Sequence, residues 1–352
     1  MKILVTILLF FMFVNSAVYA HGECCLSRSL TEATTSDMSL ANNLGLSLQY
    51  EYSNMKTIRD GSNSVSHNTV LDRVTEEWPM MSSETRSFSI PTRMIMQKYS
   101  FLGAYRLTER FQFLVNIPYV INDMYMRKIT RSTMGTGMTM DMRMDMKMDT
   151  VEGPGDMTLM GFYTLYADEL VHPTKKLSLG LGVKTPTGEN DEVTESGSLV
   201  HAMMQPGTGS WDPLFLVNYM RSFSPLVLQA NLLYHMTTEG DQGYEFGDKV
   251  SLDIIGRYRV ASYVSPGLEL NGLYAGEDDD HDGRYSRPDT SLLDNTDNTG
   301  ITSLSITPSV RLNVPGTGCS VDLKFQKPLY QHANGTQQVV DWRAIASVVW
   351  AF

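Results

Sequence analysis

The fold is decided by the end of the chain, which reads Trp342-Arg343-Ala344-Ile345-Ala346-Ser347-Val348-Val349-Trp350-Ala351-Phe352. In an extended strand alternate side chains point to opposite faces, so every second residue shares a face. One face of this stretch is entirely apolar and carries Trp342, Ala344, Ala346, Val348, Trp350 and Phe352. The pattern predicts a strand with one apolar face, and the sequence stops on an aromatic residue.

The same two-residue alternation recurs along the chain. It occurs in twelve segments, near residues 40–56, 92–106, 110–126, 154–167, 177–187, 211–222, 226–238, 249–261, 266–276, 301–314, 319–330 and 339–352. A period of two indicates strands. The connections alternate in length: long ones cover 57–91, 127–153, 188–210 and 277–300, and tight ones cover 107–109, 223–225 and 315–318.

An even number of strands with alternating short and long connections is typical of an outer-membrane barrel, whose turns are short on the periplasmic side. A soluble sandwich also has alternating strands, but the aromatic C-terminal strand resembles the signal that outer-membrane barrels present to their assembly machinery. We therefore expect an all-β protein, a transmembrane antiparallel barrel of about twelve strands. Its partners are then outer-membrane lipid of a Gram-negative bacterium and, through the strand ending at Phe352, the barrel assembly machinery.

The N-terminus predicts export. Residues 1–20, MKILVTILLFFMFVNSAVYA, have a basic start, an apolar stretch and small residues before a cleavage site, as in a secretory signal peptide. Residues 21–38 are then a periplasmic segment that can plug the barrel, and residues 39–352 form the barrel with a Met-rich loop at 127–153 and an acidic loop at 277–300.

Composition excludes several classes of function. The net charge of −11, from 28 Lys+Arg against 39 Asp+Glu, argues against a nucleic-acid partner. After the first 20 residues no run is apolar and long enough for a membrane helix. The histidines have no partner at motif spacing and no Gly-x-Ser-x-Gly elbow is present, so we expect no enzyme activity.

If the apolar faces contact lipid, the opposite positions line the lumen. The polar residues at those positions are Glu51, Lys98, Asn116, Asp156, Lys184, Gln229, Asn231, Asp253, Arg257, Arg259, Glu269, Arg311, Asp322, Lys324 and Arg343. Both signs of charge occur, which predicts a polar interior without a choice between anions and cations. The alternative is that these charges pair with one another. Twelve strands lie between the filled eight-strand barrel and the wide sixteen-strand channel, so the lumen is either a narrow channel or plugged.

Three stretches in the middle of the chain carry a family resemblance. They are Gly153-Pro154-Gly155-Asp156 leading into MTLMGFYTLY, LGLGVKTPTGEND from Leu179 to Asp191, and Gln205-Pro206-Gly207-Thr208-Gly209-Ser210-Trp211-Asp212. They resemble the outer-membrane transporter family of the meta-pathway of phenol degradation. The resemblance implies a passive channel for small solutes, hydrophobic or aromatic ones included, and it brings no catalytic residues and no required cofactor.

A methionine ladder interrupts this pattern. Met138, Met140, Met142, Met144, Met146 and Met148 fall on every second residue, which puts six thioethers on one face of a strand. Soft sulfur ligands select Cu(I) and, by the same reasoning, Ag(I). One alternative function is therefore a copper- or silver-handling barrel. The competing interpretation is an extension of the flanking strands in which methionine is an adaptable apolar filler, and a third function is a structural or adhesive barrel with a closed lumen.

The acidic loop offers a second metal hypothesis. Asp278, Asp280, Asp282 and Asp289 occupy positions one, three, five and twelve of an EF-hand-like Ca²⁺ loop. The usual Glu is missing from the last position, so a merely solvated acidic loop remains the alternative.

The three cysteines are Cys24, Cys25 and Cys319. A disulfide from Cys24 or Cys25 to Cys319 is expected, because both ends lie on the periplasmic side in an oxidising compartment. Alternatively, Cys24 and Cys25 bind a soft metal together with His21.

Overall fold

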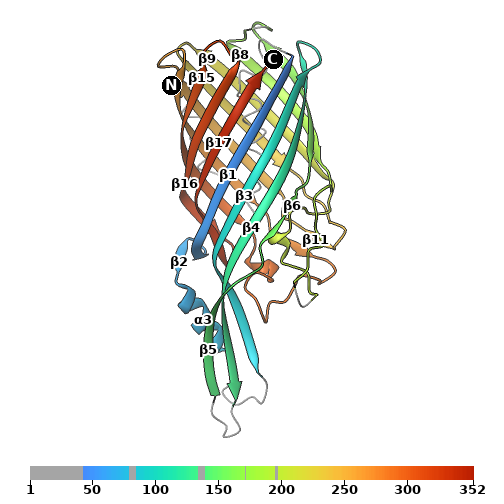
Figure 1. The fold of residues 1–352 in the computed structure, drawn as a ribbon, viewed down its shortest axis with the longest axis vertical. Coiled ribbons are helices and arrows are strands. Elements are labelled where there is room, and N and C mark those ends of the chain that lie inside the picture. The colour runs from blue at the N-terminus through green and yellow to red at the C-terminus, as the bar shows by residue number, and fades with distance from the viewer. Residues whose placement is uncertain (1–42, 79–84, 134–138, 171, 195–196) are drawn as a thin grey trace, which may run out of the picture.

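A computed structural model describes residues 43–78, 85–133, 139–170, 172–194 and 197–352. Twelve long strands form one closed antiparallel barrel, in which each strand pairs with the next one along the chain and the last pairs with the first (Figure 1). They are β1 (Leu44–Asp60), β3 (Arg86–Arg106), β4 (Phe111–Thr133), β7 (Thr158–Ala167), β8 (Lys175–Lys184), β9 (Asp212–Phe223), β10 (Leu226–His235), β12 (Lys249–Tyr258), β13 (Val264–Ala275), β15 (Ile301–Val314), β16 (Cys319–Ala333) and β17 (Thr336–Ala351). All twelve predicted segments are strands, so the predicted fold is confirmed.

Closure depends on the C-terminal strand, β17. β17 pairs with β1 from Gly45 opposite Ala351 to Asp60 opposite Thr336. On the outer surface Trp342 stacks between Tyr52 and Phe325, with ring centroids 5.3 and 5.8 Å apart. Closure leaves no unpaired strand edge to face lipid.

The two ends of the barrel differ as predicted. One end carries the short connections 107–110, 168–174, 224–225, 259–263 and 315–318, and both the start of β1 and the end of β17 lie there. The opposite end carries the long connections, with the small elements β11 (Tyr244–Glu245), β14 (Asp279–Asp280), η2 (Ala202–Met204) and η3 (Thr296–Asn298). By the rule for outer-membrane barrels, this second end is extracellular.

An arm extends beyond the barrel at the extracellular end. β3 and β4 continue past the wall, β5 (Thr139–Lys147) and β6 (Val151–Pro154) pair with β4, and β2 (Asn63–Val65) and α3 (His67–Glu76) lie beside them (Figure 1). Ser66 caps α3 by accepting a hydrogen bond from the Thr69 amide at 3.1 Å. The helix buries Val70 and Leu71 against apolar residues of the arm. No helix in the described ranges is long and apolar enough to cross a bilayer.

Candidate solute pathway

The inner face of the barrel holds most of the polar residues predicted to line the lumen. Twelve of them are buried inside the wall: Glu51, Lys98, Asn116, Asp156, Lys184, Asn231, Asp253, Glu269, Arg311, Asp322, Lys324 and Arg343, and Gln229 is buried as well. Arg257 is partly buried and reaches Asp322 at 3.4 Å. Arg259 lies beyond the end of β12 and is exposed, so it does not join the others.

One half of the wall, formed by β12, β13, β15, β16, β17 and β1, carries paired charges and is called here the ion-pair half. Arg343 lies 2.7 Å from Glu51, Lys324 lies 2.8 Å from Glu269, and Arg311 lies 2.7 Å from Asp322. The partners come from different strands, so each pair joins neighbouring parts of the wall. The charges of this half therefore neutralise one another instead of forming a ring of one sign.

The other half of the wall, β3, β4 and β7 to β10, carries a buried apolar cluster on its inner face beside polar residues and is called the apolar half. Its buried cluster consists of Leu102, Leu114, Met160, Phe162, Leu214, Leu216 and Leu233. β8 makes room for it with Gly180, where an added Cβ would lie 2.8 Å from the Phe162 ring. The result is an apolar strip inside a barrel whose outer face is also apolar.

The sequence reasoning missed this strip because it assigned apolar residues to lipid and polar ones to the lumen. The available signal was a continuous apolar run, such as Leu214-Phe215-Leu216-Val217 in β9. Such a run is typical of a strand with two apolar faces. In this stretch Phe215 and Val217 are exposed outside while Leu214 and Leu216 are buried inside.

The three stretches that carried the family resemblance meet at the extracellular end of the lumen. Each contributes a glycine to one contact: a Cβ on Gly188 would lie 2.7 Å from Cα of Gly207 and 2.8 Å from the carbonyl carbon of Gly155. The Gly207 amide donates to the Glu189 carbonyl at 2.7 Å. Only residues without side chains permit three backbones to pack this closely.

Charged side chains of the same stretches form a cluster beside the glycines. Lys184 Nζ lies 3.2 Å from Asp156 Oδ2 and 2.7 Å from Asp212 Oδ2, and His235 Nε2 lies 2.9 Å from Asp212. Asp156 also accepts hydrogen bonds from the amides of Gly188 and Thr208, each at 2.9 Å. The cluster thus holds both ends of the connection 185–211 inside the barrel.

The middle of that connection divides the extracellular part of the lumen. A mouth cavity of about 360 Å³ lies on one side of η2 and is lined by His201 and Met204 among others. An inner cavity of about 160 Å³ lies on the other side, against Ala202 and Met203 and beside Lys184 and Asp212. Asn122 fastens η2 to the wall by donating to the Met204 carbonyl at 3.0 Å. Any solute that passes from mouth to inner cavity must displace or bypass this short helix.

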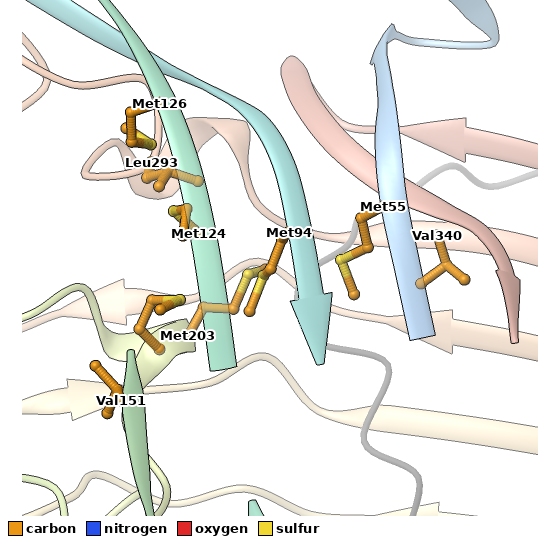
Figure 2. Packing of buried hydrophobic residues seen from close by; sticks show 9 residues of the cluster. Met55, Met94, Met124, Met126, Val151, Met203, Leu293 and Val340 are labelled. Atoms are coloured by element: carbon orange, nitrogen blue, oxygen red, sulfur yellow. The ribbon is translucent and has the colours of Figure 1, made fainter. Parts of the chain in front are cut away.

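The methionine ladder lies on the arm. Met138 falls outside the described residues, and residues 127–133 and 139–147 extend β4 and form β5. Met140, Met142 and Met144 are 45%, 56% and 53% exposed. Met146 and Met148 pack against a buried, methionine-rich cluster at the barrel mouth. Figure 2 shows the buried members of this cluster.

The carboxylates of the acidic loop are not brought together. Asp278 is buried and accepts from the Tyr244 hydroxyl at 2.7 Å and the Gly247 amide at 2.8 Å, and burial raises the pKa of its carboxyl. Asp280 accepts from the amides of Tyr285 and Ser286, and Asp282 lies 3.4 Å from Arg284. Asp289 is exposed. Within the described ranges, no three His, Cys, Asp or Glu side chains form a group able to hold a metal ion.

Two predictions concern residues outside the described ranges. Cys319, at the start of β16, is partly buried, but Cys24 and Cys25 lie in the undescribed residues 1–42, so the disulfide stays a prediction. The signal peptide at 1–20 and the periplasmic segment at 21–38 lie there too.

Solved structures with a similar fold are outer-membrane barrels. An outer membrane channel from Pseudomonas putida F1 matches with a TM-score of 0.53 and 13% identity, covering 90% of this chain and 99% of that one. A FadL homologue from Pseudomonas aeruginosa matches with a TM-score of 0.42 and 8% identity, covering 90% and 92%. The P. putida toluene transporter TodX matches with a TM-score of 0.40 and 8% identity, covering 92% of each chain.

Among curated proteins no relative matches this sequence. A protein-family model, in contrast, matches residues 100–293, more than half of the 352-residue chain, and this range contains all three motif stretches. With the closed twelve-strand barrel, this locates the protein in the Gram-negative outer membrane. The chain belongs to the family described as "Putative MetA-pathway of phenol degradation".

Proposed function

We propose that this barrel is a passive outer-membrane channel for small hydrophobic organic solutes, aromatic ones included, and that it carries out no chemical step. The observation that carries the proposal is the apolar strip on the inner face, formed by residues such as Phe162, Leu216 and Leu233. Apolar side chains on the inner wall favour contact with apolar solutes, whereas ions and sugars bind to hydrogen-bonding groups.

The order of the cavities supports a route along the apolar half. The mouth cavity is lined partly by methionine and leucine side chains, and the inner cavity beyond η2 is bounded by Pro118, Val120 and Phe246 as well as by the charged cluster. A hydrophobic solute gains roughly 25 cal/mol for each Å² of apolar surface it removes from water. Successive apolar surfaces therefore favour entry of such a solute without a coupled energy source.

The ion-pair half is consistent with the same function, because its charges are paired and do not select an ion. Because Arg343, Lys324 and Arg311 are each matched by a buried carboxylate, this half offers no unpaired charge ring to select an ion. The lumen then discriminates by size and polarity.

The test uses toluene as the probe and measures its uptake by intact Gram-negative cells with and without the barrel, because a plain phospholipid bilayer is itself readily permeable to toluene. We expect toluene to enter cells that carry the barrel faster than cells that lack it, and Leu216→Asn to slow this entry by about tenfold, since the amide replaces apolar surface on the proposed route. The matched control is Ser303→Asn, a buried position on the ion-pair half, which should leave entry unchanged. Folding of each variant is checked by its heat-modifiable migration in SDS gels.

Two results would overturn the proposal. One is entry no faster than into cells that lack the barrel, which would favour a closed structural or adhesive barrel. The other is equal slowing by the two asparagine variants, which would mean that the apolar half has no special part in passage.

A further inference from the structure

The extracellular mouth contains a concentration of thioethers. Its buried cluster and the partly buried residues packed on it include nine of the chain's 23 methionines: Met55, Met94, Met96, Met124, Met126, Met146, Met148, Met203 and Met204. Figure 2 shows buried methionines from several elements, with Met94, Met124 and Met203 gathered near one another and Met55 on the neighbouring strand. These residues are far apart in the sequence, so the fold assembles the cluster.

Strand pairing puts four of these thioethers on two adjacent rungs. Met126 of β4 lies directly opposite Met146 of β5. One rung further, the Met148 amide donates to the Met124 carbonyl at 2.9 Å. Side chains at these positions point to the same face of the sheet, because they are two residues apart along each strand.

The rungs have dimensions that suit a single ion. Opposite Cβ atoms in an antiparallel pair are about 5 Å apart, and successive ones on the same face are about 7 Å apart. The centre of such a rectangle is roughly 4 Å from each Cβ. A methionine sulfur is two bonds beyond its Cβ, so all four can approach one central ion without moving the backbone.

Packing alone does not explain the choice of methionine on this face. Along β5 the same face continues outward as Met144, Met142 and Met140, which are about half exposed and fill no gap in a core. A filler role requires neighbours on all sides. The methionines thus form one continuous face from the solvent-exposed arm to the buried mouth, and the mouth cavity opens onto it through Met146 and Met148.

We propose that Met124, Met126, Met146 and Met148 bind one soft monovalent cation, Cu(I) or Ag(I), at the barrel mouth, and that the exposed methionines of β5 lead to this site. Neutral thioethers prefer soft ions, and hard cations such as Mg²⁺ prefer oxygen. His201 is not a ligand in this arrangement: its Nδ1 accepts from the Met203 amide at 3.1 Å and its Nε2 contacts the Leu293 carbonyl.

The experiment titrates Ag(I), which needs no reducing agent, into the full-length purified barrel in detergent and measures heat and stoichiometry. Cys24, Cys25 and Cys319 are replaced by serine in every protein compared, because thiolates bind soft ions more tightly than thioethers do. The wild type is expected to bind Ag(I) and to ignore Mg²⁺. The variant Met124→Leu/Met126→Leu/Met146→Leu/Met148→Leu, which keeps apolar volume, should lose its tightest bound ion. Met160→Leu, a buried methionine of the apolar half, is the matched control and should bind as the wild type does.

A second variant distinguishes ion binding at the four mouth methionines from binding at the exposed methionines of β5. Met140→Leu/Met142→Leu/Met144→Leu should keep the tight ion and lose only weaker ones. If the fourfold variant does not fold, Met146→Leu and Met148→Leu, at partly buried positions, are each expected to weaken the tight site by about tenfold.

The proposal is wrong if the fourfold leucine variant binds Ag(I) as tightly and in the same amount as the wild type, or if Met160→Leu loses the tight ion as well. Leu216→Asn, which is expected to slow passage along the proposed solute route, should bind Ag(I) normally. Failure of the metal site and failure of the channel function are therefore distinguishable.

Discussion

The ion-pair half and the apolar half of the lumen wall share the same strand geometry but differ in what fixes them. On the ion-pair half buried charges are matched by specific partners of opposite sign, as Glu51 is by Arg343. On the apolar half the contacts are between aliphatic and aromatic side chains that depend on shape and volume. Buried pairs are intolerant of losing one member, whereas apolar clusters tolerate conservative exchange. The first half therefore acts as the rigid frame, and the second is the half along which we propose that solutes pass.

The largest expected effect is on the ion-pair half. Arg343→Ala removes the cation that lies 2.7 Å from the buried carboxylate of Glu51, and it removes the bond from Arg343 Nε to the Ser53 hydroxyl at 2.7 Å. Breaking a buried pair costs about 3–5 kcal/mol of unfolding free energy. Denaturant unfolding in lipid vesicles measures this loss.

The matched control is the double variant Arg343→Met/Glu51→Gln, which removes both charges and should recover most of the stability, because no charge is left uncompensated. If the double variant is as unstable as Arg343→Ala, the pair is not what fixes this part of the wall.

A smaller effect is expected where the motif stretches meet on the apolar half. Gly188→Ala places a methyl group 2.7 Å from Cα of Gly207, so the backbones must separate, and overpacking of this kind costs about 1–3 kcal/mol. We expect a lower melting temperature and faster protease cleavage within 185–211. Gly256→Ala in β12, where the nearest atom is 3.5 Å away, is the control and should change neither. If Gly188→Ala and Gly256→Ala lowered the melting temperature equally, the close contact of the three glycines would not be what stabilises this region.

The smallest effect on stability is expected at an exposed charge pair, in contrast to the buried pairs of the ion-pair half. His281 Nε2 lies 3.3 Å from Glu245, and that hydrogen bond raises the pKa of the imidazole. Because the folded pKa is raised, the stabilising contribution is complete below the unfolded pKa of about 6.5 and is lost as the pH rises through the folded pKa.

Hydrogen exchange at the His281 amide, which bonds to the Gly243 carbonyl at 2.9 Å, measures this loss after correction for the intrinsic rate. Protection should fall as the pH rises, and a His281→Gln variant should show no such change. A protection profile that is the same in both proteins would remove the exposed pair as a contributor.

The fold was predictable from the sequence because the side-chain period of a strand is visible in every segment. Long and short connections gave the orientation, and the C-terminal aromatic strand distinguished a membrane barrel from a sandwich. The boundaries were less predictable: β3 begins at Arg86 and β4 ends at Thr133, well outside the predicted segments, because the arm has no lipid to limit its length.

The site was predictable only in part. Positions such as Glu51 and Lys324 follow from alternation alone, but alternation does not say which charges meet. The prediction that Arg259 lines the lumen was wrong because β12 ends at Tyr258, one residue before it, so the alternation of faces along the strand does not reach Arg259. The apolar strip was not predicted because a leucine such as Leu216 is compatible with either the lipid face or the lumen face of a strand. The meeting of Gly155, Gly188 and Gly207 depends on the path of a long connection, which no local pattern encodes.

The three-glycine contact has a consequence for how the channel can diversify. The connection 185–211 is anchored near Gly188 and near Gly207, while η2, which separates the two cavities, lies between those anchors. Residues between two fixed points can change in length or character without disturbing the strands on either side. Barrels of this design can thus acquire a different filter by exchanging one short internal span, with the frame around it left as it is.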